Sequence, residues 1–294
     1  MDQVAGVLDL ATRALLGLTA VELLGGGRPA LQAFLGQFPE LAQQGLRLGF
    51  PHTFDRFHAT LGPCPAANLP DGATSFLGED LRRLVAALPG QARLVLGWSP
   101  GGQTAGVRVA GDLADPHLDA LGLPPPARAR LDLAAQLLLR PPLVEVGFTR
   151  DLTGGPPLVS VGYLLPPAAG RVETLALHRI ARGFEVGEPG SHFVRRYTQL
   201  LGGNTARPAV CRLLLQESRP RGLALAYGRP RQEAVFLAPL QEFAGWGPAE
   251  AGRLGVLAGT LQAEGPVELV ARLGCGEAPE LWLGYPVAEA AHGA

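Results

Sequence analysis

The side chains best suited to chemistry lie at alternate positions of short segments that apolar alternation predicts to be β-strands. One face of these strands would be apolar, and the other would carry glycine, tryptophan and the charged residues Arg93, Arg108, Glu145, Glu268 and Arg272. Guanidinium groups bind phosphates and other anions, and a carboxylate can orient or deprotonate a reacting group. The polar face therefore indicates either a solvated surface or a space that borders a ligand. Structural salt bridges among the same residues are the alternative interpretation.

A second motif points to a different chemistry. Gly97-Trp98-Ser99-Pro100-Gly101 matches the G-x-S-x-G elbow of serine hydrolases, with Ser99 as the nucleophile. In that fold the residue after the nucleophile donates its backbone N–H to the oxyanion, and Pro100 has no N–H. The chain downstream also lacks alternating βαβ units. A serine hydrolase is therefore only a minor alternative, and a Pro-Gly hairpin turn explains the same residues.

No motif predicts a metal or nucleotide site. His52 and His58 are six positions apart on a short segment that we expect to be helical, so they would not share a face. The chain also has no paired CxxC, no GxxxxGK[ST] and no DDxxD. We therefore expect neither a metal site made by the protein nor an organic cofactor.

The composition limits the partners. The 294 residues include 25 basic residues, all arginine, against 26 acidic residues, so the formal net charge is −1. This balance gives no electrostatic reason to expect nucleic acid or an anionic membrane as a partner. No apolar run reaches the roughly 18 to 20 residues of a membrane helix, and the N-terminus lacks a basic signal region. Three unpaired cysteines fit a reducing compartment. We expect a cytoplasmic monomer or weak homodimer.

Turn residues between alternating segments predict four β-hairpins. Their strands are 92–98 with 104–110, 143–149 with 158–164, 222–228 with 232–238, and 267–274 with 281–285. Helical periodicity is expected over 30–46, 53–61, 80–88, 127–139, 171–182, 192–201, 207–216 and 249–263. Residues 3–24 fit either one helix or a fifth hairpin, and their local pattern favours the helix. Repeated hairpins indicate an antiparallel α+β domain rather than a doubly wound parallel sheet.

Two kinds of antiparallel sheet fit this pattern. One is an open sheet with a solvated polar face. The other is a closed barrel with helices outside and a hydrated lumen. Glycine weakens an exposed strand but makes room where a ligand approaches. The polar face carries five glycines, which favour the barrel: Gly97, Gly106, Gly147, Gly162 and Gly284. A barrel of roughly ten strands is wide enough to hold a ligand.

The order of these parts resembles the αββα (ABBA) prenyltransferases, and among them the cyanobactin-type peptide prenyltransferases. The resemblance covers most of the chain. It is carried by ALQAFLGQFPELAQQGLRLGFPHTFDRFHATLG, by RLVLGWSPGGQTAGVRVAGD with LDLAAQLLLR and LVEVGFTRDLTGGPPLVSVGYLL, by VCRLLLQESRPRGLALAYGRPRQEAVFLAP, and by VELVARLGCGEAPELWLGYP. It implies one domain over residues 1–287, an antiparallel ten-stranded ABBA barrel of repeated β-hairpins with helices outside. Residues 4–24 would then be the first hairpin, and 288–294 a disordered tail.

The resemblance also implies an activity. An isoprenyl group would pass from dimethylallyl or geranyl diphosphate to a side chain of a ribosomal cyclic peptide, or to another aromatic or nucleophilic acceptor, by electrophilic alkylation in the lumen. Mg²⁺ would arrive with the diphosphate. The resemblance implies that Arg93, Arg108 and Arg272 hold the diphosphate. It implies that Trp98, Tyr163, Tyr227 and Trp282 contact the isoprenoid or the acceptor, although alternation turns both tyrosines outward. Glu145 and Glu268 would be the catalytic carboxylates, joined by Glu22 if the N-terminal hairpin forms.

The sequence departs from the family's pattern at two places. Val95 and Ser99 stand where relatives carry basic residues, and the chain has only four tyrosines. An alternative from a different functional class is therefore a catalytically inactive barrel that binds a peptide or an apolar ligand.

Overall fold

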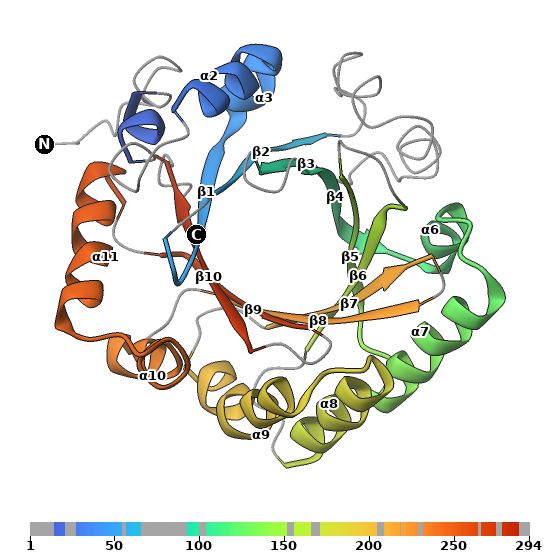
Figure 1. The fold of residues 1–294 in the computed structure, drawn as a ribbon. Coiled ribbons are helices and arrows are strands. Elements are labelled where there is room, and N and C mark those ends of the chain that lie inside the picture. The colour runs from blue at the N-terminus through green and yellow to red at the C-terminus, as the bar shows by residue number, and fades with distance from the viewer. Residues whose placement is uncertain are drawn as a thin grey trace, which may run out of the picture.

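Ten antiparallel strands form a closed barrel in the computed structural model (Figure 1). The strands are β1 (Leu46–Pro51), β2 (His58–Pro65), β3 (Arg93–Ser99), β4 (Thr104–Leu113), β5 (Leu143–Asp151), β6 (Leu158–Leu164), β7 (Val210–Gln216), β8 (Arg219–Gly228), β9 (Glu268–Leu273) and β10 (Glu280–Pro286). The structure describes residues 15–20, 28–54, 57–65, 93–99, 104–151, 156–165, 171–204, 209–217, 219–228, 232–263, 266–274 and 278–287. Each strand pairs with its neighbours in the chain, and β1 also pairs with β10, which closes the barrel.

Helices surround the barrel on the outside (Figure 1). They are α2 (Arg28–Gln37), α3 (Pro39–Gln44), α6 (Asp115–Ala120), α7 (Pro125–Leu137), α8 (Arg171–Gly183), α9 (Glu188–Gly202), α10 (Glu233–Ala244) and α11 (Pro248–Thr260). Residues 15–20 are also helical. Prolines stand at the start of several helices, where the missing N–H costs no hydrogen bond, as at Pro125 and Pro248.

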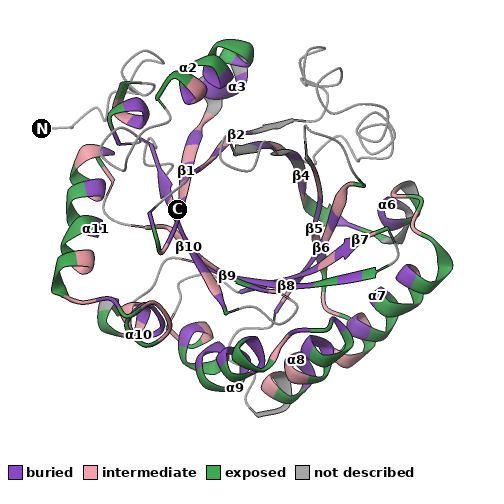
Figure 2. Cartoon of the chain, in the orientation of Figure 1, coloured by how far each residue is buried: buried purple, intermediate pink, exposed green. Residues whose placement is uncertain are grey.

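The apolar core lies between the barrel wall and the helices. Alternate strand residues such as Leu213, Leu225 and Leu269 are fully buried and form one cluster with helix residues such as Leu177 and Phe193. Figure 2 shows buried residues along the strands and on the inner sides of the helices, with exposed residues on the helices' outer sides. Because side chains alternate along a strand, the remaining strand positions face the lumen. The closed barrel, rather than the open sheet, is thereby confirmed.

Three of the four hairpins predicted from alternation are confirmed. They are β3–β4, β5–β6 and β9–β10, paired in register across their turns. The helices expected over 127–139, 171–182, 192–201 and 249–263 match α7, α8, α9 and α11, and the helical region at 30–46 is divided between α2 and α3.

The prediction for residues 207–238 was wrong in two of its segments, whereas the strand expected over 222–228 lies within β8. Residues 207–216 were expected to be a helix, but β7 occupies 210–216 and pairs with β8, while 233–244 is helix α10 rather than a return strand. The run Leu213-Leu214-Leu215 has no alternation of apolar and polar side chains, so its sequence suits a helix. Pro239 lies inside α10, where proline removes a backbone hydrogen bond and argues against a helix.

The first hairpin was also assigned to the wrong residues. Residues 4–24 were expected to form it by resemblance, but 15–20 are helical and the rest lie outside the described residues. The hairpin is β1–β2, in a region where 53–61 was expected to be helical. The helix expected at 80–88 and the tail at 288–294 lie outside the described residues.

Candidate functional site

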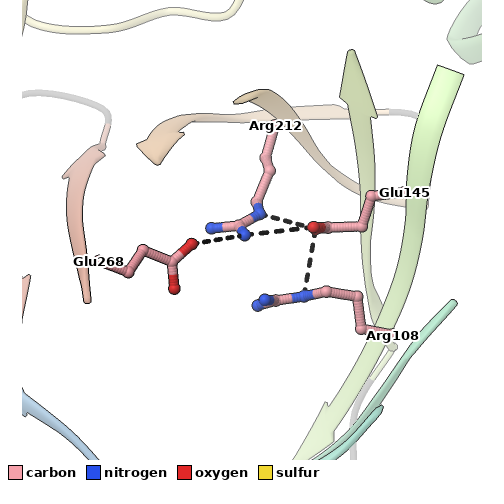
Figure 3. Close-up of polar contacts among 4 residues, drawn as sticks. All are labelled: Arg108, Glu145, Arg212 and Glu268. Atoms are coloured by element: carbon pink, nitrogen blue, oxygen red, sulfur yellow. Dashed lines mark hydrogen bonds and ion pairs between the residues drawn. The ribbon is translucent and has the colours of Figure 1, made fainter. Parts of the chain in front are cut away.

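Four charged side chains from different strands meet inside the barrel (Figure 3). Arg212 of β7 binds both carboxylate oxygens of Glu145 of β5, with Nε–Oε1 at 2.6 Å and Nη2–Oε2 at 3.2 Å. Its Nη2 also donates to Oε1 of Glu268, from β9, at 3.1 Å. Arg108 of β4 places its Nε 3.1 Å from Oε1 of Glu145. We call these four residues the lumen cluster.

The sheet register explains why these residues meet. Glu145 is opposite Gly162, and Gly162 is opposite Arg212 on the next strand, so only a glycine separates the two charged positions. A Cβ at Gly162 would lie 2.8 Å from Cβ of Glu145. Gly162 therefore makes room for a neighbouring side chain, and this is the space that the sequence pattern had suggested for a ligand.

The electrostatics of the lumen cluster keep it charged. Burial alone would raise the pKa of Glu145, but Arg108 and Arg212 outweigh it and hold that pKa below its ordinary value. Burial lowers the pKa of Arg212, but Glu145 and Glu268 more than offset that effect and raise it. Two guanidinium and two carboxylate groups give the cluster a formal charge of zero. The cluster as a whole therefore has no excess positive charge to attract an anion.

Arg272 and Trp282 form a second contact in the lumen. The guanidinium carbon of Arg272, from β9, lies 4.3 Å from the ring centroid of Trp282, from β10, which is a cation–π distance. Glu280 is 3.9 Å from Arg272 Nη1, at the limit of an ion pair. The Arg272 side chain is 46% exposed, so it is open to a ligand entering the lumen.

A cavity opens beside the lumen cluster, along β2 to β6. About 340 Å³ of space between atoms lies in this cavity, a figure that includes the part open to solvent. Its wall combines Arg108 and His58 with hydroxyl-bearing, glycine and apolar residues, namely Thr60, Val95, Gly97, Gly106, Gly147, Phe148, Thr149 and Ser160.

His58 is the other titratable group in this wall. Burial, assisted by Arg272 and Arg108, lowers the pKa of His58 to about 3, so the imidazole is neutral at pH 7. Burial and the positive charge of Arg212 likewise lower the pKa of Arg108. The Arg108 side chain is nevertheless 37% accessible, because the lumen around it contains open space.

The structure brings some of the residues singled out in the sequence together. Arg108, Glu145 and Glu268 meet in the lumen cluster, and Arg272 contacts Trp282. Arg93 and Trp98 lie on β3, but their side chains are outside what the structure describes, as is Glu22. Ser99 ends β3, and its side chain is likewise not described.

The placement of Tyr163 and Tyr227 corrects their expected role. Both rings belong to the apolar cluster between barrel and helices, with exposures of 4% and 1%. They therefore pack on the outer face of the wall, as strand alternation indicated, and do not line the lumen.

Arg212 and His58 are site residues that the sequence analysis missed. Arg212 was missed because its segment was interpreted as a helix. His58 was considered only as a metal ligand on a helix. The alternation His58-Ala59-Thr60-Leu61 carried the signal, because polar and apolar residues exchange at every step as in a half-buried strand.

The described residues offer Mg²⁺ no cage of their own. No group of three or more histidine, cysteine, aspartate or glutamate side chains in that part of the chain is close enough to hold a metal ion. Both carboxylates of the lumen cluster are paired with arginine. The donor set therefore does not fit a metal bound by protein side chains alone.

The closed barrel of five hairpins with helix pairs outside defines the ABBA class of fold. Solved ABBA prenyltransferases share it, and the first is a 5-dimethylallyltryptophan synthase from Streptomyces coelicolor, with a TM-score of 0.65 and 13% identity over 98% of this chain and 100% of that chain. A 6-dimethylallyltryptophan synthase from Micromonospora olivasterospora, in complex with DMASPP and Trp, has a TM-score of 0.64 and 14% identity, covering 96% and 98%. The prenyltransferase PriB, in a ternary complex with L-tryptophan and dimethylallyl thiolodiphosphate, has a TM-score of 0.63 and 17% identity, covering 96% of each chain.

These likenesses establish the ABBA prenyltransferase fold for this chain. No protein-family model matches the sequence, and no curated protein is significantly similar to it. The cyanobactin-type subfamily therefore stays a prediction. Among the described residues, no helix has both the length and the apolar character needed to cross a membrane.

Proposed function

We propose that this protein transfers an isoprenyl group from an allylic diphosphate to a nucleophilic acceptor inside the barrel. The observation that carries the proposal is the cavity in the lumen of an ABBA barrel, with Arg108 and His58 in its wall and Arg272 within electrostatic reach. Solved proteins with the same fold bind dimethylallyl thiolodiphosphate and tryptophan, which supports this class of substrate.

In this proposal each of these side chains has a part in the reaction. The allylic C–O bond breaks and its electron pair leaves with the diphosphate, whose growing charge Arg108 and Arg272 stabilise. The electron pair of the acceptor then forms the new bond to the allylic carbon, and the displaced proton passes to an oxygen of the released diphosphate. Trp282 holds Arg272 in the lumen and offers a ring face to positive charge.

Glu145 acts here through Arg108. Its Oε1 lies between the Nε atoms of Arg108 and Arg212, so it fixes where the Arg108 guanidinium lies at the cavity. Glu268 in turn fixes Arg212. These carboxylates are positioning residues in the proposal, because both are engaged by guanidinium groups rather than open to an acceptor.

The charge balance favours a substrate that brings its own cation. The lumen cluster is neutral and Arg272 lies near Glu280, so these described side chains do not compensate the roughly three negative charges of an allylic diphosphate. Mg²⁺ bound to phosphate oxygens and water would supply the missing charge, and Mg²⁺ usually binds in this way beside substrate phosphates.

The acceptor presents one side chain to the lumen. The cavity is partly open to solvent, so an acceptor can reach it from outside the barrel. In the proposal a cyclic peptide inserts one residue at the barrel mouth, whereas free tryptophan enters whole.

Calorimetric titration with dimethylallyl thiodiphosphate, with and without Mg²⁺, tests the diphosphate site. We expect binding to the wild type that weakens at least about tenfold in Arg272→Gln and in Arg108→Gln, as for a charge-assisted contact. Arg128→Gln removes an arginine that pairs with Asp119 on the surface and is the matched control. Mass spectrometry of reactions with tryptophan and with cyclic peptides then shows which acceptor gains an isoprenyl unit. No binding to the wild type would refute the proposal.

A non-catalytic barrel is the second candidate, and the neutral lumen cluster is the observation that favours it. Such a barrel would bind a peptide or apolar ligand without cleaving a diphosphate. Thiodiphosphate binding that depends on Arg272 distinguishes the two functions, because an apolar ligand does not need that cation.

A further inference from the structure

His58 lies in the wall of the cavity beside the lumen cluster. It begins β2, and its ring crosses the face of β3 at Gly97, where a Cβ would stand 2.6 Å from Nε2 and 2.7 Å from Cε1. Among the described residues, no hydrogen bond to either ring nitrogen occurs. A polar ring that borders open space and has no partner is available to a ligand.

The surroundings of His58 are positive. Arg272 of β9 and Arg108 of β4 are the charged groups that act on it, and Arg47 of β1 adds to the positive field at Arg108. The residues facing His58 on the adjoining strands, Gly49 and Gly97, are uncharged. The carboxylates of the lumen cluster are bound to arginine and do not stabilise an imidazolium. The ring is therefore neutral at pH 7, with a pKa of about 3.

An anion in this cavity would reverse that balance. Thr60, Thr149 and Ser160 line the same space as His58 and Arg108, and their hydroxyl groups can donate to phosphate oxygens. A negative charge placed between Arg108 and His58 offsets the positive field and favours the protonated ring. A doubly protonated imidazole has an N–H at both nitrogens and donates to an anion without any other rearrangement.

We propose that His58 binds the diphosphate as an imidazolium, so that the protein takes up a proton from solvent when the anion enters the cavity. This inference rests on the proposed function. The proton adds to Nε2 or Nδ1, and the new N–H donates to a phosphate oxygen. When the product diphosphate leaves, Arg108 and Arg272 again destabilise the imidazolium and the proton returns to solvent. His58 thereby supplies one of the cations that the neutral lumen cluster lacks.

Calorimetry in pairs of buffers with different ionisation enthalpies measures the proton uptake. The probes are dimethylallyl thiodiphosphate and inorganic pyrophosphate. They are titrated between about pH 5.5 and pH 8, a range that includes the ordinary histidine pKa. We expect the wild type to take up as much as about one proton more than His58→Gln. Because both proteins bind the same ligand, the difference between them excludes protons that the ligand itself takes up. Affinity of the wild type relative to His58→Gln should then rise by up to about tenfold for each unit of falling pH.

Two glycine variants test the same inference with His58 present. Gly97→Ala places a methyl group against the ring and displaces it, so the extra proton uptake should fall. Gly49→Ala is the control and should keep the uptake, because its Cβ would meet Trp282 Cε3 at 3.6 Å and the His58 carbonyl oxygen and Cβ at 3.7 and 3.8 Å, which are ordinary contacts that leave the ring in place. Circular dichroism and thermal unfolding show whether each variant is folded.

The outcomes separate the two proposals. Binding with equal proton uptake by the wild type and His58→Gln overturns the inference and leaves the proposed function standing. Failure of both probes to bind the wild type overturns both. Uptake that His58→Gln and Gly97→Ala lose, and that Gly49→Ala keeps, supports the inference.

Discussion

Removing Arg212 is the perturbation with the largest expected effect on stability. In the wild type this side chain is 6% exposed and contacts Glu145 through two hydrogen bonds and Glu268 through one. Arg212→Met leaves the buried Glu145 with Arg108 as its only cation in the cluster and takes the cation from Glu268. The cluster's formal charge changes from zero to −1. Breaking a buried ion pair by removing one partner costs about 3 to 5 kcal/mol.

Urea denaturation at pH 7 measures this loss. The free energies of unfolding are compared between variants whose dependence on urea concentration, the m-value, is the same. The matched control is Arg128→Met. Arg128 is 24% exposed and pairs with Asp119 and Asp132, which are 71% and 53% exposed, and such surface pairs contribute about 1 kcal/mol or less each. The double variant Arg212→Met/Glu145→Met removes both partners, so it should be more stable than the sum of the single variants predicts. The free energy of unfolding of Arg212→Lys should lie between those of the wild type and Arg212→Met, because lysine keeps the charge but cannot make the bidentate contact with Glu145.

Two results would refute this reasoning. One is a cost for Arg212→Met no larger than that for Arg128→Met, which would mean that the lumen hydrates the unpaired carboxylates. The other is a double variant whose cost equals the sum of the single variants, because independent sites show no coupling.

Further predictions concern the same barrel. The folded protein lowers the pKa of His58 to about 3, whereas the unfolded chain binds the proton below about 6.5. The free energy of unfolding therefore decreases as the pH is lowered between these values. From pH 7 to pH 5 we expect His58 to cause a loss of up to about 2 kcal/mol, which His58→Gln should remove in urea titrations. Glu145→Gln should destabilise by at least about 1 kcal/mol more than Glu268→Gln in the same assay, since Glu145 binds two arginines and Glu268 binds one. Gly222 has φ +114°, and a Cβ there would meet the carbonyl oxygen of Leu273 at 2.1 Å, so Gly222→Ala should lower the melting temperature far more than Gly245→Ala, whose φ is +65° and whose Cβ site is open. Equal melting temperatures would contradict this backbone argument.

The sequence by itself determined the two faces of most strands. Alternation assigned Glu145, Gly147 and Thr149 to one face of β5 and Val146 to the other, and the structure places Glu145 in the lumen cluster and Val146 in the outer apolar cluster. Side-chain direction reverses at each strand residue, so this information is local and needs no tertiary contact. The glycines of the polar face and the hairpin turns were readable for the same reason.

Only the tertiary structure decided which segments complete the barrel. β7 has apolar side chains on both faces, so Val210–Gln216 carries no period-two signal and its pairing with β6 and β8 makes it a strand. β1 and β2 are likewise strands because β10 and β3 pair with their outer edges and leave no open edge.

The pairing of charges was also beyond the sequence. Arg212 and Glu145 are far apart in the chain and meet because β6 lies between their strands with a glycine at the crossing point. His58 has a depressed pKa because barrel closure brings β9 and β4 near β2, with Arg272 and Arg108 facing it. Local alternation specifies which way a side chain points, but the field and the partners it meets come from strands that pair only when the barrel closes.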